Sequence, residues 1–105
     1  EGVTEIGRQL SHLATLRQMS VSVAGMLNDG ENPALEASVV KDLGTVFEQE
    51  LPNIAHRLMR VEPDSQGTDF QRYLAILTQT SPSFSLRGGT REILRGIIAR
   101  GLGLR

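Results

Sequence analysis

The sequence predicts an all-α fold, an antiparallel up-and-down bundle of four helices that forms a single domain over residues 1–105. Three observations favour this class. Apolar residues recur at spacings of three and four along most of the chain, as on the inner face of an amphipathic helix. No segment has the convincing alternation of a β-strand. Short polar segments with Gly, Pro, Asn and Asp separate the periodic stretches, and short loops join antiparallel neighbours in a bundle.

The first helix is predicted over about residues 4–27. Its apolar stripe consists of Ile6, Leu10, Leu13, Leu16, Val23, Ala24 and Leu27. The run Asn28-Asp29-Gly30 is expected to end this helix, because these residue types tolerate the left-handed backbone that often terminates a helix.

The second helix is predicted over about residues 33–61, with Asn32 as N-cap and Pro33 at the first helical position, where no backbone N–H is needed. Its stripe is Leu35, Val39, Leu43, Val46, Phe47, Leu51, Ile54, Leu58 and Val61. Pro52 lies within this stripe, and an interior proline removes one helical hydrogen bond. Because the stripe continues beyond Pro52, we expect a kink or a short break there rather than the end of the helix.

A polar loop over residues 62–67 leads to a third helix, predicted over about 69–79 with Thr68 as its cap. The run Ser81-Pro82-Ser83 is expected to break this helix.

Phe84 and Leu86 are then expected to continue in an extended conformation into the run 87–90, Arg-Gly-Gly-Thr. The last helix is predicted over about 90–102, with Thr90 as its N-cap. Its apolar residues are Ile93, Leu94, Ile97, Ile98 and Leu102.

The composition is that of an ordinary globular domain, with 39% hydrophobic and 22% charged residues and a net charge of -1. Nucleic-acid binding is not expected, because such modules concentrate basic residues on one face. No apolar run approaches the roughly 18 residues of a membrane span. The absence of cysteine excludes disulfides and thiolate metal sites and is compatible with a cytoplasmic location. Because the chain starts at Glu1 rather than Met, we expect a piece of a longer protein.

No metal site is predicted, because neither His12 nor His56 has a ligand-type partner three or four residues away on its helix. The chemically informative segment lies at residues 87–105. Gly88 and Gly89 allow a tight bend and a close approach of the backbone to a ligand. Beyond Thr90, the first turn of the helix offers free N–H groups and a positive dipole end, which suit polar or anionic ligand atoms. The same pattern also fits a plain turn followed by a capped helix.

Residues 88–99 read Gly-Gly-Thr-Arg-Glu-Ile-Leu-Arg-Gly-Ile-Ile-Ala, and residues 102–104 read Leu-Gly-Leu. This string closely resembles the motif near the C-terminus of acyl-CoA dehydrogenases. Residues 32–58 resemble the long bundle helix of that family, and residues 4–27 resemble its preceding helix only generically. The resemblance covers most of the chain, and it is specific over about residues 86–105.

The resemblance implies an FAD-dependent parent enzyme that dehydrogenates an acyl-CoA thioester at its α and β carbons and passes electrons to an electron-transfer acceptor. It implies that an N-terminal helical domain and a β-domain precede this C-terminal bundle. By position, Gly89, Thr90 and Glu92 match family residues beside the flavin, and Arg95 matches a structural arginine. Thr90 as a plain cap and Glu92 as a favourable first-turn charge remain open as alternatives.

Two positions depart from the family pattern. Many members carry the catalytic glutamate directly before Gly-Thr, and here that position is Gly88, so no catalytic residue is predicted within this chain. The base would then lie upstream, or be absent as in partner subunits or members with different chemistry. A Phe-Gly-Gly-like stretch that contacts FAD in many members is missing from residues 79–86. We expect the chain alone to be inactive.

Five arginines make the last segment basic: Arg87, Arg91, Arg95, Arg100 and Arg105. They would either hold phosphates of FAD or coenzyme A, or form a solvated face balanced by the acidic second helix. The chain is expected to self-associate, as a homo-oligomer, because its amphipathic helices belong to a larger packing unit. The alternative function is a helical dimerisation module that binds no cofactor, or a non-catalytic subunit of an acyl-CoA dehydrogenase-like complex.

Overall fold

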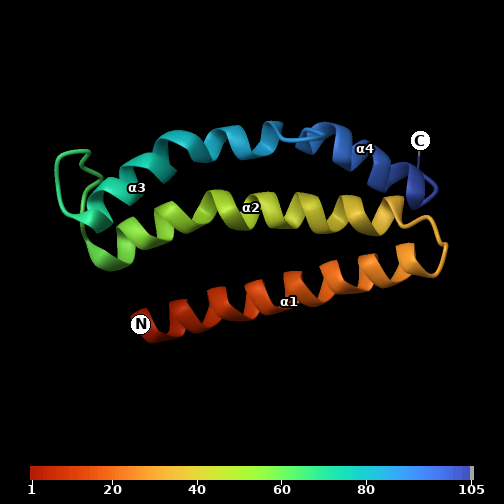
Figure 1. Ribbon diagram of the computed structural model, residues 1–105, viewed down its shortest axis with the longest axis horizontal. Coiled ribbons are helices and arrows are strands. Elements are labelled where there is room, and N and C mark those ends of the chain that lie inside the picture. The colour runs from red at the N-terminus through yellow and green to blue at the C-terminus, as the bar shows by residue number, and fades with distance from the viewer. Residues whose placement is uncertain (105) are drawn as a thin grey trace. The chain divides into compact units, whose positions relative to one another are not determined.

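The computed structural model describes residues 1–104 of the chain, and the predicted all-α fold is confirmed (Figure 1). Four α-helices and one 3-10 helix follow one another, and the described residues contain no β-strand. Their bounds are α1 Gly2–Asn28, α2 Ala34–Met59, α3 Asp69–Thr80, the 3-10 helix η1 Ser81–Leu86, and α4 Arg91–Gly101. Arg105, which the sequence analysis counted among the basic residues of the last segment, lies outside the described residues.

The start of α2 corrects the sequence prediction by one residue. The backbone N–H of Ala37 donates to the carbonyl of Pro33 at 2.8 Å, so Pro33 rather than Asn32 precedes the first helical residue, Ala34. Proline suits this place because its backbone has no N–H to satisfy. The helix then runs without a break through Pro52, which is buried. Because Pro52 has no N–H, its burial leaves no unpaired backbone donor.

The segment after α3 is helical, so the prediction of an extended conformation for Phe84 and Leu86 was wrong. Both residues belong to η1, which has Pro82 in its first turn. The fixed φ of proline is compatible with a 3-10 helix. The Ser83 hydroxyl donates to the Thr80 carbonyl at 2.6 Å, and the Ser85 hydroxyl donates to the Pro82 carbonyl at 3.2 Å. These i to i−3 hydrogen bonds follow the spacing of the 3-10 helix.

The chain divides into two compact units. The first contains Glu1–Gly44 and the segment from Gly89 onward, and the second contains Thr45–Gly88. Helix α2 contributes its beginning to the first unit and its remainder to the second.

In the first unit, α1 ends in a Schellman motif. The N–H of Glu31 donates to the carbonyl of Met26 at 3.0 Å, and the N–H of Gly30 donates to Leu27 at 3.1 Å. Gly30 has φ +82, the left-handed conformation that this motif requires and that glycine adopts without a Cβ penalty. The expected termination at residues 28–30 thus has its physical cause in Gly30.

The face of α1 that the sequence pattern marks as apolar is largely exposed. Helix α1 has no buried residue, and Ile6, Leu10 and Leu13 are each more than half exposed. The partly covered positions of α1 include Leu16 and Val23 from the predicted stripe, together with Glu5, Gln9, Met19 and Met26 from outside it. Apolar periodicity therefore identified the helix correctly, but the chain covers only part of the predicted stripe.

Helix α4 runs antiparallel to the beginning of α2 within the first unit. At the start of α4, the Arg91 Nε donates to the Asp42 Oδ1 at 2.9 Å. At its end, a Cβ on Gly101 would come within 3.0 Å of the Leu35 side chain, so the two helix backbones approach closely there. Leu94, only 5% exposed, lies between these two contacts along α4.

In the second unit, α3 returns antiparallel to the later part of α2. The loop before α3 is organised by Gln71, whose side-chain Oε1 accepts from the Thr68 N–H at 2.9 Å while Thr68 Oγ1 accepts from the Gln71 N–H. This reciprocal pair is a capping box. Near the other end of α3, the Gln49 side chain of α2 donates to the Ser81 carbonyl at 3.0 Å. Leu74 and Ala75 are the buried residues of α3.

Candidate functional site

The start of α4 in the first unit contains the three residues that the sequence analysis assigned to cofactor binding. Gly89 and Thr90 precede the helix and Glu92 lies in its first turn. Thr90 has the extended backbone of an N-cap, with φ -68 and ψ 165. Its Oγ1 accepts a long hydrogen bond of 3.4 Å from the Ile93 N–H, and its carbonyl accepts from the Leu94 N–H at 2.9 Å.

The hydrogen-bonding capacity of this turn is only partly used within the helix. The Thr90 hydroxyl accepts from Ile93 but keeps its own proton, which it can donate elsewhere. The N–H groups of Arg91 and Glu92 belong to the first turn, where an α-helix provides no acceptor. These three donors, at the positive end of the helix dipole, fit polar or anionic atoms such as those on a flavin.

Gly89 has a structural role within α4 itself. A Cβ there would lie 3.3 Å from Leu94 Cδ2 and 3.6 Å from Ile93 Cγ2. The absence of a side chain lets the incoming backbone lie against these two residues at the start of the helix. The sequence suggested that Gly89 lets the backbone approach a ligand closely. In the structure, the side chains of Ile93 and Leu94 make a close approach to Gly89.

Gly88, the last residue of the second unit, is the position at which the resemblance would place a catalytic glutamate. It has φ +68, a left-handed conformation that costs an L-residue other than glycine roughly 1–2 kcal/mol. A glutamate at this position would therefore strain the backbone. The local backbone therefore favours glycine at this position.

Glu92 is exposed and lies in the first turn of α4. A carboxylate there interacts favourably with the helix dipole. The arrangement accommodates both of the open interpretations, a first-turn charge and a hydrogen-bond acceptor for a ligand.

The Leu-Gly-Leu tail of the motif is the C-terminal cap of α4. The Leu104 N–H donates to the Ala99 carbonyl at 2.8 Å, and the Gly103 N–H donates to Arg100 at 3.0 Å, with Gly103 at φ +83. These two bonds form a second Schellman motif. The glycine of the tail is therefore explained by helix termination, without a ligand.

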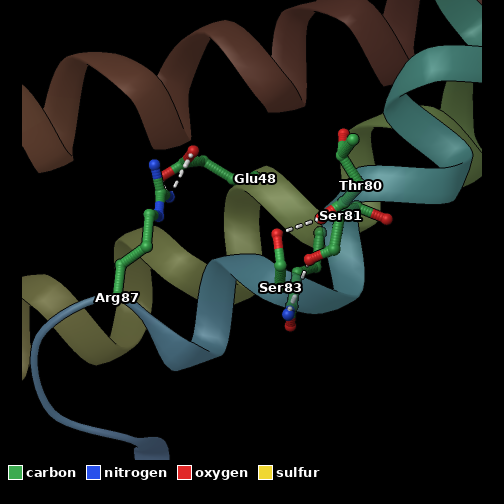
Figure 2. Close-up of polar contacts among 6 residues, drawn as sticks. Glu48, Thr80, Ser81, Ser83 and Arg87 are labelled. Atoms are coloured by element: carbon green, nitrogen blue, oxygen red, sulfur yellow. Dashed lines mark hydrogen bonds and ion pairs between the residues drawn. The ribbon is translucent and has the colours of Figure 1, made fainter.

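Several of the arginines in the last segment pair with acidic residues of α2. In the second unit, Arg87 reaches Glu48 at 2.9 Å and lies over the Phe84 ring at 4.6 Å; Figure 2 shows the pairing with Glu48. In the first unit, Arg91 and Arg95 both face Asp42. These three ion pairs correspond to the second of the two alternatives for the arginines, in which acidic residues of the second helix balance their charge.

Asp42 is the residue of this region that the sequence analysis did not single out. Its side chain is only 15% exposed, with Arg91 Nε at 2.9 Å and Arg95 Nε at 4.0 Å. Arg91 and Asp42 are 49 positions apart in the sequence, so no local pattern connects them. The sequence signal that could have pointed to such a partner is Arg91 at the first position of α4. A cation there is unfavourable unless a nearby negative charge compensates it.

Within residues 1–104, no group of three or more His, Cys, Asp or Glu side chains is placed to hold a metal ion. His56 lies 3.1 Å from the Glu62 carboxylate at the surface of the second unit. None of the described helices combines the length and the apolar character that crossing a membrane requires.

Comparison of the chain with protein-family models, with curated proteins and with solved structures gave no match. The case for a function therefore comes from the residues and geometry described above.

Proposed function

We propose that this chain is the C-terminal helical portion of an FAD-dependent acyl-CoA dehydrogenase, an oxidoreductase that introduces the α,β double bond into an acyl-CoA thioester. The observation that supports the proposal most is the string 88–99, in which Gly-Gly-Thr precedes a helix and Thr90 caps it. Its helical surroundings, an all-α chain with two long helices, fit the same assignment.

In this proposal the start of α4 binds the flavin. The Thr90 hydroxyl and the first-turn N–H groups donate hydrogen bonds to it, Glu92 lies beside it, and Gly89 keeps side-chain bulk away from the turn. A bound flavin would supply the two-electron redox chemistry. The polypeptide's contribution here is to orient the cofactor.

The proposal assigns no catalytic base to this chain, because Gly88 carries no side chain and has a left-handed backbone. The proton acceptor would lie in the rest of the parent enzyme, and the isolated chain would be inactive. Acyl-CoA would be the substrate and an electron-transfer protein the acceptor. The parent would be a cytoplasmic homo-oligomer with FAD as its cofactor.

Flavin retention by the intact protein tests this function. We expect the purified protein to carry FAD, seen by its visible absorbance. Thr90→Val removes the donating hydroxyl and should weaken FAD binding about threefold to tenfold, whereas Thr90→Ser should not. Thr68→Val is a matched control, because Thr68 caps α3 through the same bond to the third residue of its helix. Equal FAD affinity in the Thr90→Val and Thr68→Val proteins would contradict a role for Thr90 in binding.

A second candidate is a helical dimerisation module without a cofactor, or a non-catalytic subunit. The exposed apolar residues of α1 favour it, because a contiguous apolar face on a soluble chain commonly marks an interaction surface. A colourless protein that associates and binds no added FAD would favour the module. A protein that binds FAD without turning over acyl-CoA would favour the subunit.

A further inference from the structure

Helix α4 begins with a charge that is unfavourable for an isolated helix. Arg91 is its first residue, and a cation there opposes the positive end of the helix dipole. The neighbouring residues follow the usual rules, with Thr90 as N-cap and Glu92 as a first-turn acid. Where one residue violates a local rule that its neighbours obey, a compensating tertiary contact or a function is expected.

The compensation comes from Asp42 on α2. Arg91 Nε donates to Asp42 Oδ1 at 2.9 Å, and the exposed fractions of the two side chains are 32% and 15%. A second cation, Arg95, lies one turn further along α4 with its Nε 4.0 Å from Asp42 Oδ2. Partial burial and two cationic neighbours make this contact less screened by solvent than an ordinary surface ion pair.

The rest of α4 is held independently of this ion pair. Leu94 is buried, and Gly101 allows the close approach to Leu35 at the far end of the helix. Loss of the ion pair would therefore release the first turn of α4 while leaving its remaining contacts in place. That first turn contains Thr90 and Glu92, the residues proposed to contact the flavin.

We propose that Asp42 is a positioning residue, which fixes the first turn of α4 through Arg91 and thereby sets the orientation of Thr90 and Glu92 for the ligand. The identity of the ligand rests on the proposed function, whereas the positioning of the turn rests on the geometry alone. Asp42 itself makes no contact with the ligand in this account and acts through Arg91.

The test compares four variants of the intact protein. Asp42→Asn and Arg91→Gln each remove the ion pair from one side, and Asp42→Glu retains the charge. Glu48→Gln is the matched control, because Glu48 also lies on α2 and also pairs with an arginine at 2.9 Å, in the other unit.

The first readout is hydrogen exchange of the backbone amides of residues 94–97, which bond across the first two turns of α4. Asp42→Asn and Arg91→Gln should each accelerate it about tenfold relative to the wild type. Asp42→Glu and Glu48→Gln should not, and exchange in α3 should stay unchanged in all four. Unchanged exchange at residues 94–97 would overturn the proposal. Equal acceleration in α3 would also overturn it, because it would show that Asp42 stabilises the whole fold and not the first turn of α4 alone.

The second readout is the dissociation constant of added FAD. If the wild type binds FAD, the two ion-pair variants should bind it about tenfold more weakly at an unchanged melting temperature, with affinity restored by Asp42→Glu. Wild-type affinity in Asp42→Asn would overturn the positioning role. A wild type that binds no FAD contradicts the proposed function instead, and the exchange measurement still decides whether Asp42 fixes the turn.

Discussion

At the scale of single residues, Arg60 has a conformation that its side chain disfavours. It follows the last residue of α2 with φ +52, where helices usually place glycine. Arg60→Gly should therefore raise the free energy of unfolding by about 1 kcal/mol. Arg57→Gly, at an exposed position inside the same helix, should lower it by about 1 kcal/mol. Urea denaturation of both variants checks the prediction, and a destabilised Arg60→Gly protein would contradict it.

Gly67 illustrates a glycine required by contact rather than by backbone conformation. A Cβ on Gly67 would overlap the Gln71 side chain, whose Oε1 accepts from the Thr68 N–H in the capping box. Gly67→Ala should displace Gln71 and cost about 1 kcal/mol of stability, as the loss of a cap does. Gly7→Ala is the comparison, because nothing lies near that position inside α1 and alanine favours a helix by about 1 kcal/mol. Thermal melts that rank the two variants in the opposite order would refute the contact argument.

Single-residue signals also account for most of what the sequence predicted correctly. Thr68 and Thr90 were identified as caps because capping depends on residues within one turn, and both side chains accept from the third residue of their helix. Gly30 ended the first helix for an equally local reason. The pairing of Asp42 with Arg91 could not be predicted, because it depends on how α4 lies on α2.

At the scale of elements, the fit between α4 and α2 depends on one face of α4. Gly101→Ala would place a Cβ 3.0 Å from Leu35 and should cost about 1–3 kcal/mol through overpacking. Gly96→Ala lies in the same helix with its nearest neighbour, Arg100 Nη1, at 3.8 Å, and should gain about 1 kcal/mol from helix propensity. Both variants make the same Gly→Ala change, so the difference between their free energies of unfolding, measured by chemical denaturation, reports the packing against Leu35 rather than helix propensity. Similar stabilities would mean that α4 does not rest on Leu35.

Two elements differ from their sequence-based expectation for physical reasons. Ser81-Pro82-Ser83 ended α3 as expected, yet the chain continued as a 3-10 helix, because the serine hydroxyls and the fixed φ of proline support i to i−3 bonding. The buried positions of α2 include Ser38, Thr45 and Pro52, spaced seven apart, while Leu43 is 48% exposed. Periodicity locates a helix, but which face is covered depends on partners that a single sequence does not specify.

At the scale of the whole molecule, the exposed apolar surface predicts self-association. Ile6, Leu10 and Leu13 lie at spacings of four and three on α1 and are more than half exposed. Leu10→Glu should shift the protein toward smaller species, because a charge at an interface core opposes its burial. Ser11→Glu, at the next and also exposed position of α1, is the control. Sedimentation analysis across a concentration series would contradict the prediction if the wild type stays monomeric throughout.

The proposed acyl-CoA dehydrogenase function is tested by anaerobic titration of the intact protein with a panel of acyl-CoA thioesters while its visible absorbance is recorded. We expect a yellow protein whose flavin absorbance is bleached by at least one thioester, with the base supplied from outside this chain. A colourless protein that takes up no FAD would contradict it.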